Sequence, residues 1–149
     1  MKMPICALSF YFFAIGYCCA ALQEREYNVW YEKDGVLYDI TQTPDGNPVM
    51  ISISQSGFKT ANMVISYESE GMCQKSTPAL DINGEVIAAK YACAQQGKDK
   101  IEHFIVNDAA KVNALVGHLK SDFTVVVQGS IKVWAANIKT PKYGMAPRF

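Results

Sequence analysis

Two cysteines have the type and spacing to form a disulfide bond. The chain holds five cysteines, and three of them lie within the first twenty residues, which leaves Cys73 and Cys93. Asn83-Gly84 lies about midway between this pair and is a strong signal for a two-residue hairpin, because both turn positions need a positive φ. A hairpin there would bring the cysteines together, one register step from directly opposite. Because their spacing is not that of a redox-active C-x-x-C pair, we predict a structural disulfide.

The other reactive side chains form no recognisable catalytic or metal-binding pattern. His103 and His118 are the two histidines, and a histidine can serve as a general base or a metal ligand. Residues 56–59 spell S-x-x-K, and residues 81–85 resemble part of a calcium loop. Each lacks the rest of its motif and is typical of a turn. We therefore expect no cofactor and no metal, and we favour a protein without enzymatic activity.

Three aromatic residues are candidates for binding a partner. Trp30 and Tyr31 fall in the first β-prone segment. Trp134 alternates with Ile131 and Val133, and it faces outward if those two residues face the core. Exposed Trp and Tyr side chains are common anchors of protein interfaces. The alternative is that these aromatic residues provide ordinary packing of a sheet with both faces covered.

The elements that position these residues follow from hydrophobic periodicity. Alternating apolar and polar residues predict short strands. We expect them at 27–32, 36–41, 49–54, 63–68, 79–82, 85–93, 101–106, 123–128 and 131–136. The apolar residues from Ala109 to Leu119 instead recur at helical spacing. With Asn107 or Asp108 as the N-cap, this pattern predicts a helix over about 108–120.

Short strands joined by hairpin turns, together with one helix, indicate an antiparallel α+β domain in which the helix packs on the sheet. The alternative is a β-sandwich with a peripheral helix. The sequence has no internal repeat and no linker, and so we expect a single domain at residues 21–138. Residues 139–149 contain Pro141, Gly144 and Pro147 without periodicity. We expect a flexible tail there.

The first twenty residues have the layout of a secretory signal peptide. Lys2 precedes an apolar stretch from Ile5 to Ala21, and a polar segment starts at Gln23. We expect cleavage after Ala20 or Ala21 and a periplasmic or secreted domain that is not inserted in the membrane. An uncleaved membrane anchor is the main alternative. Lipidation of Cys18 or Cys19 is a third, although neither cysteine follows a good lipobox.

The net charge of the chain and its overall architecture limit the classes of function that we expect. The formal charge of the whole chain is zero, and removal of Lys2 leaves 13 basic and 14 acidic residues, which argues against nucleic acid as a partner. In architecture the chain resembles small exported proteins of Gram-negative bacteria that carry one disulfide, such as periplasmic inhibitors, immunity proteins and secretion or conjugation accessory factors. We therefore expect a non-enzymatic protein that binds another protein. A carrier of a small apolar ligand and a small hydrolase that uses His103 or His118 are the alternatives, and the oligomeric state is left open.

Overall fold

The structure contains two β-sheets, and the larger one has seven strands. In a computed structural model, residues 26–144 are described, and they contain eleven strands and one helix. Sheet A has seven strands in the order β11-β1-β2-β3-β4-β8-β7, antiparallel except for the parallel pair of β11 and β1. These strands are β1 (Tyr31–Lys33), β2 (Val36–Gln42), β3 (Pro48–Ser54), β4 (Asn62–Glu70), β7 (Lys90–Gln96), β8 (Asp99–Val106) and β11 (Lys142–Tyr143).

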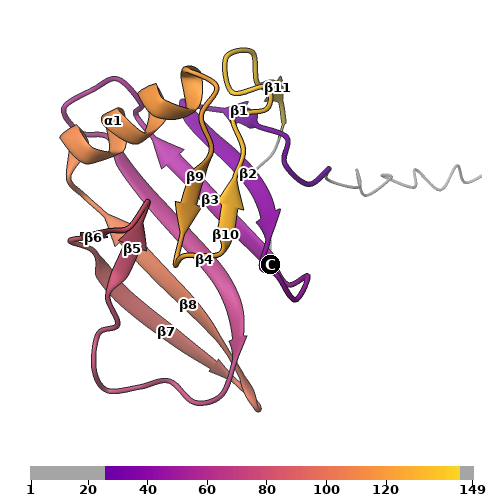
Figure 1. The fold of residues 1–149 in the computed structure, drawn as a ribbon, viewed down its shortest axis with the longest axis vertical. Helices are drawn as coiled ribbons and strands as arrows, with labels where there is room; N and C mark the ends of the chain where they lie inside the picture. Colours follow the sequence, from indigo (N-terminus) through magenta and orange to yellow (C-terminus); the bar gives the residue numbers. More distant parts are fainter. Residues whose placement is uncertain (1–25, 145–149) are drawn as a thin grey trace, which may run out of the picture.

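A second, smaller sheet and the helix cover one face of sheet A (Figure 1). Sheet B has four short strands in the order β10-β9-β5-β6. They are β5 (Leu80–Ile82), β6 (Glu85–Ile87), β9 (Val125–Val127) and β10 (Ile131–Val133). The predicted class, an antiparallel α+β domain with one helix packed on a sheet, is confirmed. The strands are divided between two sheets, a feature that it shares with the sandwich alternative.

Helix α1 (Ala109–Lys120) begins one residue after the start of the predicted range and ends where that range ends. Asp108 is the N-cap, and its carboxylate accepts hydrogen bonds from the backbone N–H groups of Ala110 and Lys111. These bonds satisfy two of the amides that a helix start leaves unpaired. The buried side of α1 carries Val112, Val116 and Leu119. Local signals alone therefore account for this element.

The core lies between sheet A on one side and sheet B with α1 on the other. We call the covered side of sheet A its core face and the opposite side its outer face. Side chains alternate between the two faces along each strand, so that Ile51, Ile65 and Phe104 are buried on the core face. The cavity left between the two layers has a volume of about 10 Å³. This volume is about that of a single water-sized probe, and the core is therefore filled.

The hairpin prediction is wrong in one respect. Asn83 and Gly84 do form the turn, with φ angles of 55° and 80°. The second arm, however, breaks after Ile87, and the chain passes from sheet B to sheet A. There β7 pairs with β8 along all seven residues, from Lys90 to Gln96. This ladder is longer than the three-residue ladder of β5 with β6, and the longer pairing determines where the second arm goes.

Both ends of the described chain also differ from the prediction. The first strand begins at Tyr31, because Asn28 has a positive φ of 58° and turns the chain before the strand. The expected tail starts instead as an ordered segment, because β11 pairs with β1 and the Lys142 amide donates to Trp30 O at 2.9 Å.

Residues 145–149 and the predicted leader lie outside the described residues. No helix within residues 26–144 is long and apolar enough to cross a membrane.

Candidate functional site

A groove of about 520 Å³ lies at the end of the molecule that is uppermost in Figure 1. Four pieces of chain converge there: the β1–β2 hairpin, the turn between β3 and β4, the C-terminal end of α1, and the segment before β11. The groove is lined by Glu32, Asp34, Gly35, Val36, Leu37, Ser54, Gln55, Ser56, Phe58, Lys120, Ile138, Lys139 and Pro141. Its volume falls within the range of ordinary small-molecule pockets.

One rim of the groove presents an exposed aromatic side chain on a rigid loop. The Phe58 side chain is 67% exposed. Asn113 of α1 holds this loop from both sides, since its Oδ1 accepts from the Gly57 amide at 2.8 Å and its Nδ2 donates to Phe58 O at 3.0 Å. The Phe58 amide also donates to Gln55 O at 3.0 Å. The loop conformation is thus fixed while its apolar ring stays in solvent.

A second exposed aromatic residue lies beside the opposite wall. Tyr143 of β11 is 81% exposed and is the cross-strand partner of Glu32, a lining residue of the groove. Backbone hydrogen bonds hold this strand in place, among them the Gly144 amide donating to Glu32 O at 3.3 Å. Exposed aromatic residues therefore lie on both sides of the groove. Aromatic anchors that are already held in place lose little conformational entropy on binding.

Charges of opposite sign line the two walls. Glu32 and Asp34 are on the hairpin wall, and Lys120 and Lys139 are on the wall at the end of the helix. Lys139 Nζ forms an ion pair with Asp122 at 2.7 Å. Lys120, Glu32 and Asp34 are the charged lining residues for which no ion pair is found within residues 26–144.

Two of the three predicted partner-binding residues are buried. Trp30 is 0% exposed on the core face, where its Nε1 donates to Trp134 O at 2.9 Å. The Asn137 side chain forms two hydrogen bonds with the backbone of Trp30. Its Oδ1 accepts from the Trp30 amide, and its Nδ2 donates to Trp30 O. Tyr31 is 8% exposed. These two side chains cannot contact a partner, because neighbouring parts of the fold cover them.

Trp134 is placed as the alternation indicates. Ile131 and Val133 are buried, and Trp134 is 43% exposed with Lys132 Nζ 5.7 Å from its ring centroid. Its backbone carbonyl holds Trp30, and its side chain is not among the residues that line the groove. The structure therefore does not bring the three aromatic candidates together into one surface.

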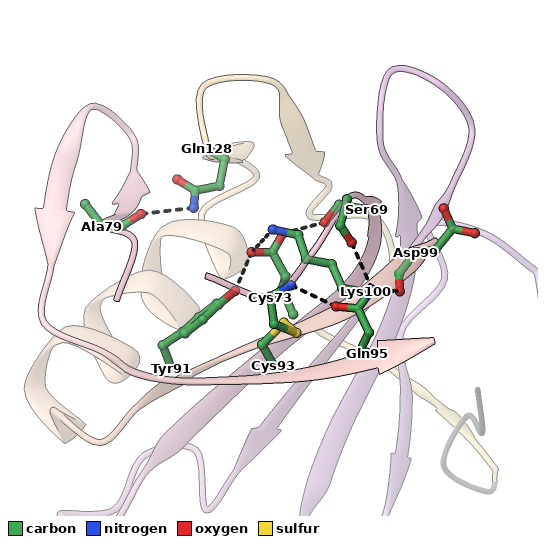
Figure 2. Close-up of polar contacts among 11 residues, drawn as sticks. Ser69, Cys73, Ala79, Tyr91, Cys93, Gln95, Asp99, Lys100 and Gln128 are labelled. Atoms are coloured by element: carbon green, nitrogen blue, oxygen red, sulfur yellow. Dashed lines mark hydrogen bonds and ion pairs between the residues drawn. A yellow bond between two sulfur atoms is a disulfide. The ribbon is translucent and has the colours of Figure 1, made fainter. Parts of the chain in front are cut away.

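The predicted disulfide is confirmed, although another geometry brings its cysteines together. Cys73 and Cys93 are bonded with a Cα–Cα distance of 5.8 Å. Cys73 lies in the loop between β4 and β5, and Cys93 lies in β7, so the bond joins that loop to sheet A (Figure 2). Gln95 supports it, since Gln95 Oε1 accepts from the Cys73 amide at 2.8 Å and Nε2 donates to Gly71 O at 3.1 Å.

A polar cluster lies on the core face close to the disulfide (Figure 2). Glu102 Oε1 accepts from the Tyr91 hydroxyl at 2.7 Å and pairs with Lys100 Nζ at 3.4 Å, and Oε2 accepts from Ser69 Oγ at 2.6 Å. Burial raises the pKa of Glu102, but these three partners outweigh burial and hold its pKa below the usual value. Burial and the Glu102 carboxylate raise the pKa of Tyr91 to about 12.

This cluster is closed on itself, because each of its charged groups already has a partner inside the protein. Neither a free base nor a free acid with a pKa near neutrality results from it. The cluster stabilises the strand pairing of β4, β8 and β7. We assign it a structural role.

The histidines are also separate from each other. His103 Nδ1 lies 2.7 Å from Ser66 Oγ on the outer face of sheet A. His118 stacks on Phe123 with ring centroids 4.8 Å apart. No group of three or more His, Cys, Asp or Glu residues within the described part of the chain is arranged to hold a metal ion.

The S-x-x-K residues 56–59 and the residues 81–85 that resemble part of a calcium loop both form turns. Ser56 and Lys59 flank the loop that presents Phe58, and Ser56 lines the groove. Asp81 Oδ1 accepts from the Gly84 amide at 3.1 Å, which closes the hairpin turn. The sequence indicates only a turn at Phe58, and it places Tyr143 in a tail that could dock a partner. An apolar residue inside a polar turn is the signal that points to Phe58.

No family model, curated protein or solved structure matches this chain.

Proposed function

We propose that this chain is an exported, non-enzymatic protein that binds another protein through the groove. The observation that carries the proposal is Phe58, whose ring stays in solvent on a loop that Asn113 fixes with two hydrogen bonds. Exposing a large apolar ring on a rigid loop brings no gain in stability to the isolated domain. A well-placed aromatic side chain at the edge of a groove is instead a typical interface anchor.

The export part of the proposal draws on the disulfide and on the leader sequence. Disulfides persist in oxidising compartments such as the periplasm and the extracellular space. Export is tested by the intact mass of the protein isolated from the cell envelope. The expected mass lacks the leader and two further hydrogens, which are lost on disulfide formation. A full-length mass in the cytoplasmic fraction would contradict it.

The two alternative functions have less support. A carrier of an apolar ligand needs an internal cavity of a few hundred Å³, and the space between sheet and helix is about 10 Å³. A hydrolase based on His103 needs a cleft and a stabiliser for the reacting oxygen. Ser66 and His103 lie instead on the outer face of sheet A, on the paired strands β4 and β8, outside the residues that line the groove.

Site-specific crosslinking from position 58 tests the groove. A photoreactive phenylalanine analogue at position 58 should crosslink to one defined protein in cells, and the same analogue at Met72, an exposed side chain in the loop between β4 and β5 and outside the groove lining, should not crosslink to that protein. Phe58→Ala and Tyr143→Ala should each weaken binding of the captured protein about tenfold or more, whereas Met72→Ala should leave it unchanged. Equal capture by Phe58→Ala and the parent protein would overturn the proposal.

A further inference from the structure

The loop between β4 and β5 is exposed at its tip. We call residues 71–79 the β4–β5 loop. Its residues 74–77 are all exposed, and they form no hydrogen bond or ion pair within residues 26–144. The chain bends at Lys75 and Ser76, which therefore lie at the tip of the loop. Exposed loop tips of this kind are the parts of a folded domain that a protease reaches most easily.

Both ends of the exposed segment are held by the rest of the fold (Figure 2). Cys73 is bonded to Cys93 of β7, and its amide donates to Gln95 Oε1 at 2.8 Å. At the other end, Ala79 O accepts from Gln128 Nε2 at 3.1 Å, directly before β5. The segment is thus attached to sheet A through the disulfide and to sheet B through β5.

Pro78 limits the conformations of the segment further. Its ring fixes its own φ at about −65°, and its Cδ keeps the preceding residue, Thr77, out of the helical region. A disulfide and a proline both reduce the freedom of a loop before it binds, so that less conformational entropy is lost on binding. The β4–β5 loop is therefore both exposed and preorganised.

Lys75 carries the single charge of the β4–β5 loop. It lies between the uncharged residues Gln74 and Ser76, and no acidic group within residues 26–144 pairs with it. Serine proteases of the trypsin type have an aspartate in the pocket that binds the residue before the cleaved bond. An unpaired lysine on a narrow loop fits such a pocket. An apolar pocket would instead have to bury the charge without a partner.

We infer that the β4–β5 loop binds the active-site cleft of a serine protease that cleaves after lysine, places Lys75 in its specificity pocket and inhibits it. The backbone amides and carbonyls of residues 74–77 have no partner in the domain and are free to pair with the cleft. This surface is separate from the groove. Strand β4 starts beside the turn that lines the groove, and the loop leaves from the other end of β4 (Figure 1).

The attachment of both ends explains how the loop inhibits the protease. The serine oxygen of the protease bonds to the carbonyl carbon of Lys75, and the bond to the Ser76 nitrogen breaks as that nitrogen takes up the serine proton. The disulfide and β5 keep the new amine close to the acyl group, so that it re-forms the peptide bond at a high effective concentration.

Hydrolysis competes slowly with this reversal. When water attacks the acyl group, its oxygen and one hydrogen complete the carboxyl group of Lys75, and its other hydrogen returns to the protease serine. The cleaved protein remains in one piece, because the Cys73–Cys93 bond links the part before the cut to the part after it.

Inhibition of trypsin by the purified protein with its disulfide intact tests the inference. Hydrolysis of a small lysine substrate should be inhibited with a constant of about 1 μM or lower. Lys75→Ala should raise this constant about a hundredfold or more, whereas Lys75→Arg should keep it within about tenfold. Lys75→Leu should transfer the inhibition to chymotrypsin, whose pocket is apolar. Lys98→Ala, at an exposed lysine in the turn between β7 and β8, should have no effect.

The double variant Cys73→Ser with Cys93→Ser tests the role of the attached end. It should inhibit trypsin about tenfold less strongly or worse, and trypsin should cleave it after Lys75 faster than it cleaves the oxidised parent. Circular dichroism confirms that the variant is folded. Mass spectrometry of the parent after long incubation should show the addition of one water, with two pieces that separate only after reduction.

Three outcomes would overturn the inference. The first is a parent protein that does not slow trypsin at micromolar concentrations. The second is inhibition that Lys75→Ala leaves unchanged. The third is a parent protein that is cleaved after Lys75 as fast as the folded double variant, which would make the loop an ordinary substrate. Because the groove contributes no residue to this loop, none of these results depends on what the groove binds.

Discussion

Asp39 is a carboxyl group buried in the core without a hydrogen-bond partner. It lies on the core face of β2, opposite Ile51, and is 1% exposed, and neither of its oxygens is paired. Burial raises the pKa of Asp39 to about 7, and the nearby backbone amides of Ile40 and Val29 offset only part of this effect. The folded protein therefore holds a proton that the unfolded chain releases above pH 4.

We expect the free energy of unfolding to decrease as the pH rises from about 4 to about 7. A raised carboxyl pKa means that the folded state binds more protons in this window, so stability is greatest below the unfolded pKa and is lost through the folded pKa. With about 1.4 kcal/mol for each pKa unit, the loss is at most about 4 kcal/mol. Asp39→Asn should remove this pH dependence in urea unfolding followed by tryptophan fluorescence.

A matched substitution separates this effect from general changes in charge. Asp45 is exposed in the loop between β2 and β3, and Asp45→Asn should leave the pH profile as it is in the parent protein. If Asp39→Asn and the parent lose stability in parallel between pH 4 and pH 7, the carboxyl of Asp39 is not the titrating group.

Asn113 provides the second prediction at the residue scale. Asn113→Ala removes the two hydrogen bonds that hold the loop of Phe58. We expect a loss of about 1 kcal/mol, since each bond contributes roughly 0.5–1.5 kcal/mol and alanine returns part of this as a better helix former. Hydrogen exchange of residues 55–60 should accelerate while that of β8 does not change. Unchanged exchange in the loop would show that other contacts hold Phe58 in place.

At the scale of elements, the disulfide links a loop to a strand of sheet A. The bond closes a segment with a sequence separation of 20 residues, which corresponds to about 3 kcal/mol in the chain-entropy model. The double variant Cys73→Ser with Cys93→Ser should lose about this amount in urea unfolding. The parent protein under reducing conditions should match it. A double variant as stable as the oxidised parent would contradict the prediction.

Elements with local signals could be predicted from the sequence, and their partners could not. Helix α1 carries its cap and its apolar stripe within fourteen residues, and it was placed to within one residue. The break after Ile87 depends on β8, a strand that comes later in the chain and offers a longer ladder. Periodicity shows which residues alternate, but it does not show which strand lies beside which.

The candidate site was harder to predict for the same reason. The groove forms where four pieces of chain converge, and no local pattern indicates that convergence. The sequence allows Trp30 to be exposed or in the core, and it is buried because a segment more than a hundred residues later covers it. Phe58 lies in a turn, where its exposure depends on the contacts of Asn113.

At the scale of the whole molecule, Asn137 joins the two ends of the domain. Its side-chain oxygen accepts from the Trp30 amide at 2.7 Å, and its side-chain nitrogen donates to Trp30 O at 3.0 Å. Asn137→Ala should cost roughly 1–3 kcal/mol, because two backbone groups lose their partner in a partly buried position. Equilibrium unfolding in urea measures the loss, with Asn47→Ala in an exposed loop as the control. Equal stability of the two variants would argue against this role.

The contacts between Trp30 and Asn137 also determine when folding can finish. They are separated by 107 residues in the sequence, and β11 completes sheet A only after Lys142 is available. Native contacts between such distant residues form slowly, because the intervening chain must first be ordered. A chain that crosses a membrane as an unfolded polymer benefits from this delay. Under the proposed export, sheet A could be completed only after residue 142 had crossed the membrane.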